Sequence, residues 1–219
     1  MSTIFLSPEW FFKYNILFEI FFLIISLIIA TFALKVYRTT GQKLAKYFGY
    51  GFLLISIAFL TQSVSTFFVL TKINTQLCAA MQASSVASID AAGTYLYMGF
   101  MIAGIVTILF VSLKSNTTRT LWLLLAASLI AIALSRNPIY TFYLLASIYL
   151  AFITGHFIAY YLKNKKIKTL LVALAFLFLW FGTFHFLISV NREIFYVIGY
   201  VLELIAYLLI LSNWIILRK

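Results

Sequence analysis

Seven long apolar stretches occupy almost the whole of this chain of 219 residues. A helix needs roughly 20 apolar residues to cross a bilayer core, and continuous runs of that length exclude the short alternating strands of a membrane barrel. Hydrophobic residues make up 64% of the sequence, against about 45–50% in a soluble domain. We therefore expect an all-α, polytopic membrane protein. Its single domain, residues 1–219, is predicted to be one bundle of seven transmembrane helices, at about 10–36, 44–70, 91–113, 120–134, 138–162, 169–190 and 194–217.

The segments between these spans are short and carry most of the charge. Residues 71–90 are expected to form the only sizeable loop. Of the 16 lysines and arginines, four fall at one set of span ends (Lys13, Lys72, Arg136 and Arg192) and the remaining twelve at the other set. Because basic residues concentrate on the cytoplasmic side, the N-terminus is predicted to lie outside and the C-terminus inside. We therefore interpret the basic residues behind the net charge of +11 as topology signals and as contacts for anionic lipid head groups. We expect no nucleic-acid partner.

Polar groups within the spans are the places to look for function, because burying them in a membrane is costly. Glu19 and Glu203 each lie nine residues inside the outer end of a span, roughly 14 Å deep at 1.5 Å per residue. His185 and Gln62 fall in the same outer half. The predicted ligand-binding residues are these four together with Asn15, Tyr95 and Tyr200.

Two interpretations of the two buried acids remain open. In the first, they line a polar pocket that opens to the outside, and they share a proton if they come within hydrogen-bond reach, because two like charges in a low dielectric cannot both ionise cheaply. In the second, each carboxyl group is satisfied by a hydroxyl group on a neighbouring helix. Equal depth is necessary for the shared pocket but does not show that the two helices face each other.

Metal and cofactor sites find little support in the sequence. The chain has one cysteine and two histidines, His156 and His185, and these histidines lie roughly 15 Å apart in depth, which excludes haem held by both. No zinc-ligand spacing is present. The span at 194–217 contains no lysine, and every lysine lies at a span end or in a loop, so a retinal Schiff base is excluded. We expect no metal and no cofactor.

The first two spans and the last span resemble a known family. Phe18-Glu19-Ile20, the run Lys35-Val36-Tyr37-Arg38-Thr39-Thr40, the run Tyr50-Gly51-Phe52-Leu53-Leu54 and the run Glu203-Leu204-Ile205-Ala206-Tyr207 look like the seven-transmembrane, membrane-associated sensor domains of archaeal and bacterial signalling proteins. The resemblance implies a seven-span sensor that feeds a cytoplasmic kinase or cyclase. This chain ends at Lys219 without such an output domain, so the resemblance implies signalling through a separate cytoplasmic partner.

Three functional hypotheses follow, in order of preference. The first is a non-enzymatic sensor or receptor in the cell membrane, with a pocket that opens outward. The second is a proton- or cation-coupled transporter that uses Glu19 and Glu203. The third is a membrane transpeptidase, because Cys78, Arg136 and His185 occur in an order similar to the Cys, Arg and His of exosortase-like enzymes, with the cysteine as nucleophile. The residues after Cys78 depart from that family's pattern, and an enzyme is the least favoured of the three.

Overall fold

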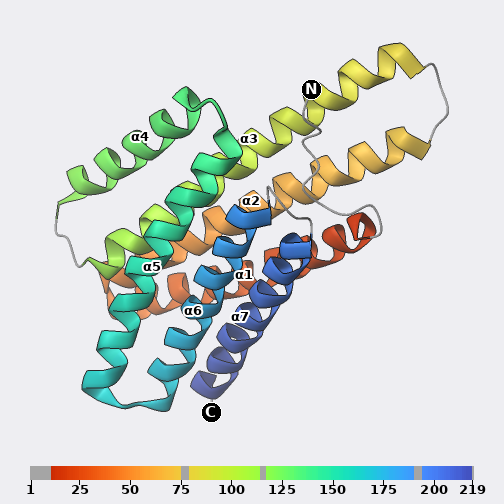
Figure 1. The fold of residues 1–219 in the computed structure, drawn as a ribbon. Helices are drawn as coiled ribbons and strands as arrows, with labels where there is room; N and C mark the ends of the chain where they lie inside the picture. The colour runs from red at the N-terminus through yellow and green to blue at the C-terminus, as the bar shows by residue number, and fades with distance from the viewer. Residues whose placement is uncertain (1–10, 75–78, 114–116, 190–193, 219) are drawn as a thin grey trace.

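The computed structural model describes residues 11–74, 79–113, 117–189 and 194–218. Every regular element in these ranges is an α-helix (Figure 1). Six helices in the described ranges are long and apolar enough to cross a membrane, and these indicate a multi-pass membrane protein, as expected. The helices of the part of the chain that the structure describes are α1 (Phe12–Thr40), α2 (Lys43–Asn74), α3 (Ala79–Ser112), α4 (Thr118–Leu134), α5 (Pro138–Asn164), α6 (Ile167–Ser189) and α7 (Ile194–Arg218).

The prediction of a long loop at residues 71–90 is wrong. Helix α2 continues to Asn74 and α3 begins at Ala79, so most of that segment is helical. The polar composition suggested a loop, but the segment is rich in alanine, which has the highest helix propensity of the 20 residues. Helices α2 and α3 therefore extend beyond the spans expected at 44–70 and 91–113 (Figure 1).

Local sequence explains several helix ends. Gly41 adopts a left-handed conformation with φ of 69°, and its N–H donates to the Tyr37 carbonyl, which ends α1. The Asn137 side chain accepts a hydrogen bond from the Tyr140 N–H, and Pro138 occupies the first turn of α5, where a missing N–H costs nothing. Lys165 caps the other end of α5 in a left-handed conformation.

The bundle is held together by close contacts between helices that are neighbours in sequence. Helix α2 packs between α1 and α3, α6 packs between α5 and α7, and α1 contacts α7. Gly104 of α3 meets Gly51 of α2 so closely that a Cβ added at Gly104 would lie 2.7 Å from the Gly51 carbonyl oxygen. Small residues of this kind let membrane helices approach. Aromatic rings fill the centre, where Phe22 stacks on Tyr207 at 4.8 Å and Phe59 lies 5.3 Å from Phe22.

Helix α4 returns the chain from the end of α3 to the start of α5. Helices α3 and α5 contact each other and run in the same direction, because Tyr97 near the start of the α3 span meets Phe142 near the start of α5. Helix α4 therefore runs antiparallel to both, at the edge of the bundle (Figure 1). It is tied to α5 by a 2.8 Å hydrogen bond between the Ser128 and Tyr149 hydroxyl groups.

Candidate functional site

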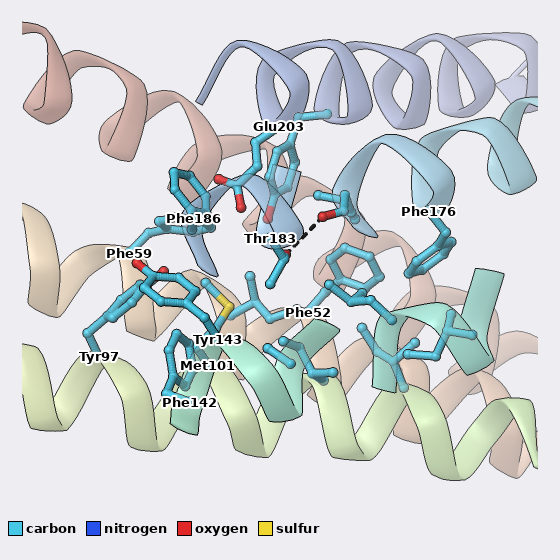
Figure 2. A pocket seen from close by; sticks show the side chains of 18 residues that line it. Phe52, Phe59, Tyr97, Met101, Phe142, Tyr143, Phe176, Thr183, Phe186 and Glu203 are labelled. Atoms are coloured by element: carbon cyan, nitrogen blue, oxygen red, sulfur yellow. Dashed lines mark hydrogen bonds between the residues drawn. The ribbon is translucent and has the colours of Figure 1, made fainter. Parts of the chain in front are cut away.

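The described part of the bundle encloses a central cavity of about 40 Å³ (Figure 2). Its wall is built from α2, α3, α5, α6 and α7 and is almost wholly apolar and aromatic. Four rings form a continuous arc, because Tyr97 contacts Phe142, Phe142 contacts Tyr143 and Tyr143 contacts Phe186, with ring centroids 5.8, 5.0 and 5.4 Å apart. These rings come from three different helices, so the cavity exists only in the assembled bundle.

Glu203 is the one carboxylic acid among the residues that line this cavity. It lies on α7, is 8% exposed, and points from that helix into the ring-lined space (Figure 2). Among the residues that the structure describes, none makes a hydrogen bond with its carboxyl group. A buried polar group without a hydrogen bond is costly, so this arrangement needs a reason.

Two glycines give Glu203 its position. Gly182 of α6 lies against α7, where an added Cβ would be 3.1 Å from the Gly199 carbonyl oxygen and 3.2 Å from Glu203 Cγ. An added Cβ at Gly199 would lie 2.6 Å from the Phe186 ring. The absence of side chains at both positions therefore brings α6 and α7 together and lets Phe186 and Glu203 share the cavity.

Thr183, the residue after Gly182 on α6, also lines the cavity. Its hydroxyl group donates to the Leu179 carbonyl at 2.9 Å (Figure 2). The hydroxyl oxygen keeps lone pairs that can accept a hydrogen bond, because this bond uses only its hydrogen. Thr183 can therefore accept, but not readily donate, a hydrogen bond within the cavity.

Glu19 occupies a separate and tighter environment on α1, where it is 1% exposed. It does not line the cavity. The polar side chains that face it are Tyr200 of α7 and Thr66 of α2, although neither carboxyl oxygen reaches hydrogen-bonding geometry with a described residue. The Tyr200 hydroxyl lies 3.2 Å from that of Tyr196. Glu19 thus belongs to a compact polar cluster between α1, α2 and α7.

The seven predicted ligand-binding residues separate into groups. Glu203 lines the cavity, whereas Glu19, Tyr200 and Asn15 belong to the polar cluster, where Asn15 faces Tyr196. Gln62 is half-buried on α2, and its amide oxygen has no hydrogen-bond partner among the described residues.

The other two predicted residues lie near the surface of the bundle. His185 is half-buried on α6, with Nδ1 2.7 Å from the Phe181 carbonyl oxygen and its ring beside Phe195. Tyr95 is 54% exposed and lines a groove of about 530 Å³ together with Arg136, at the starts of the α3 span and of α5. Cys78, the nucleophile of the transpeptidase hypothesis, lies outside the described residues.

Sequence reasoning missed the aromatic wall. Tyr97 and Tyr143 lie close to span ends, where tyrosine usually serves as an interface anchor. Phe142 and Phe186 are two of 23 phenylalanines, and no spacing separates those facing the cavity from those facing lipid. Only the placement of Glu203 within a span pointed to this region.

A second cavity, of about 130 Å³, adjoins the first toward the C-terminal half of α7. Phe52 and Phe176 line both cavities and so form the partition between them. Asn213 of α7 supplies a polar side chain to the second cavity. Both partition rings are almost completely buried, and Phe176 is stacked on Phe157 at 4.8 Å.

The described residues contain no group of three or more His, Cys, Asp or Glu side chains that could hold a metal ion. Comparison with known proteins gives no match to a family, to a curated protein or to a solved structure.

Proposed function

We propose that this protein is a receptor- or sensor-type protein of the cell membrane that binds a small molecule in the central cavity, with Glu203 as the polar anchor. The observation that carries the proposal is a buried carboxyl group, without a hydrogen bond from any described residue, that faces a ring-lined cavity inside a membrane bundle. Ligand pockets are typically apolar with a few placed polar groups, and ionisable residues inside membranes mark functional sites.

In this proposal the chain crosses the membrane seven times, with the N-terminus outside. Helix α4 counts as a span because it must return the chain across the same layer that α3 and α5 cross in parallel. Its 17 residues span about 25 Å at 1.5 Å per residue, near the lower limit for a bilayer core. The basic segments Lys43–Lys46 and Lys163–Lys168 then face the cytoplasm, where they contact anionic lipids or a separate signalling protein.

Filling the cavity tests the proposal. Ala146 is buried on the cavity wall, so Ala146→Val adds two methyl groups there, while Ala133→Val makes the same change at an exposed position of α4. We expect at least one compound from a panel of two- to five-atom amines, alcohols and acids to raise the melting temperature of the wild-type protein and of Ala133→Val, but not of Ala146→Val. A panel without any such compound refutes the proposal.

Transport is the second candidate, and the adjoining cavities favour it. If the Phe52 and Phe176 rings swing aside, the two cavities join into one path along the bundle. A cavity ligand that accumulates in proteoliposomes, at a rate changed by Phe52→Ala and abolished by Glu203→Gln, would establish transport. Binding without uptake favours the receptor.

A further inference from the structure

We infer that the central cavity takes a small ammonium cation, of the size of methylammonium, with the Glu203 carboxylate as its counter-ion and the arc of Tyr97, Phe142, Tyr143 and Phe186 as its wall. This inference rests on the proposed function, because it names the ligand class of the same cavity.

The sign of the ligand's charge follows from Glu203. An anion would face a carboxyl group, and a purely apolar molecule would leave that carboxyl group buried without a partner, which costs free energy. A cation with N–H donors supplies both the missing charge and the missing hydrogen bonds. Thr183 lines the same cavity and can accept one more N–H, because its own hydroxyl hydrogen is already donated to Leu179.

The wall decides what kind of cation fits. Metal ions such as Ca²⁺ need six or more oxygen ligands, and this wall offers few oxygens. Aromatic faces attract ammonium groups by a cation–π interaction, which strengthens when water is excluded. A methyl group on the ammonium nitrogen also matches the apolar part of the wall. The cavity therefore favours an alkylated ammonium over a hydrated inorganic ion.

The size of the cavity limits the ligand to a few atoms. One water molecule needs at least about 10–15 Å³ on the same scale, so 40 Å³ has room for roughly three. Methylammonium has two non-hydrogen atoms and fits, while tetramethylammonium requires the wall to move. Affinity should therefore fall from methylammonium to tetramethylammonium.

Calorimetric titration of the full-length protein in lipid nanodiscs tests this inference. The probes are methylammonium chloride, sodium chloride at equal ionic strength, and methanol, which has the same number of non-hydrogen atoms without the charge. We expect binding of methylammonium only. Glu203→Gln should weaken it at least tenfold, whereas Glu19→Gln, a buried acid outside the cavity, should leave it within about twofold.

A second pair of variants keeps the test decisive if Glu203→Gln fails to fold. Phe142→Leu removes one ring of the arc and should weaken methylammonium binding severalfold, and Phe181→Leu, at an exposed ring of α6, should not. If the wild-type protein and Glu203→Gln bind methylammonium with equal affinity, the inference of a cationic ligand is refuted. Equal binding of methanol and methylammonium also refutes it. If a neutral or anionic compound binds in a manner blocked by Ala146→Val while methylammonium does not, the ligand class is wrong and the cavity function stands. If none of these compounds binds, both the ligand class and the proposed function of the cavity are wrong.

Discussion

At the scale of single residues, the two buried acids differ in what their carboxyl groups face. Glu19 faces the hydroxyl-bearing side chains of Thr66 on α2 and Tyr200 on α7, whereas Glu203 faces a largely apolar space. Replacing a buried charged or polar group by a well-packed apolar one is often neutral or stabilising. In our proposal, Glu203 is therefore a functional residue that is retained at the expense of stability.

We predict that Glu203→Met stabilises the ligand-free protein by about 1–2 kcal/mol, because methionine fills a similar volume without burying an unpaired carboxyl group. The matched change Glu19→Met should give no gain, since Tyr200 and Thr66 would lose the polar group that they face. Reversible unfolding in mixed micelles, followed by tryptophan fluorescence, measures both. A Glu203→Met protein less stable than wild type by more than about 1 kcal/mol would mean that Glu203 is structural.

At the scale of helices, the approach of α2 and α3 depends on Gly104. We predict that Gly104→Ala lowers the free energy of unfolding by about 1–3 kcal/mol, because the new methyl group would meet the Gly51 carbonyl and the Ile55 side chain at under 3 Å. Gly99→Ala, on the same helix, has open space around its Cβ position and should leave stability unchanged or slightly raised. Equal losses for both variants would show that the close contact is not what matters.

The role of α4 can be tested from its two ends. In a Cys78→Ala background, which removes the only native cysteine, Thr117→Cys and Asn137→Cys place single thiols just before and just after this helix. We predict that a membrane-impermeant thiol reagent labels Asn137→Cys in intact cells and Thr117→Cys only after permeabilisation. Labelling of both from one side would reduce the number of spans to six.

The helices could be predicted more completely than the site. Long apolar runs with basic ends indicated the segments that become membrane helices, and Asn137-Pro138 marked the start of α5. The alanine-rich start of α3 was missed because its residues are polar enough to suggest a loop. The cavity wall could not be predicted, because a span such as 138–162 is apolar on every face and its sequence does not show whether Phe142 or Leu144 turns inward.

At the scale of the whole molecule, helices from both halves of the chain meet around one residue. Glu203 comes from the last helix, while the rings opposite it come from α3, α5 and α6. Glu19, from the first helix, lies in a neighbouring cluster at a similar predicted depth. The bundle therefore holds two acids in separate environments, and only one of them has access to the cavity.

The most direct measurement is carboxyl ¹³C NMR of the glutamate-labelled protein in lipid bilayers. The sequence has four glutamates (Glu9, Glu19, Glu193 and Glu203), and Glu19→Gln and Glu203→Gln assign the two buried signals. We predict that saturating methylammonium shifts the Glu203 signal and leaves the Glu19 signal in place. A shift of Glu19 instead of Glu203, or an unchanged Glu203 signal with any compound that stabilises the protein, would contradict the assignment of Glu203 as the anchor of the cavity.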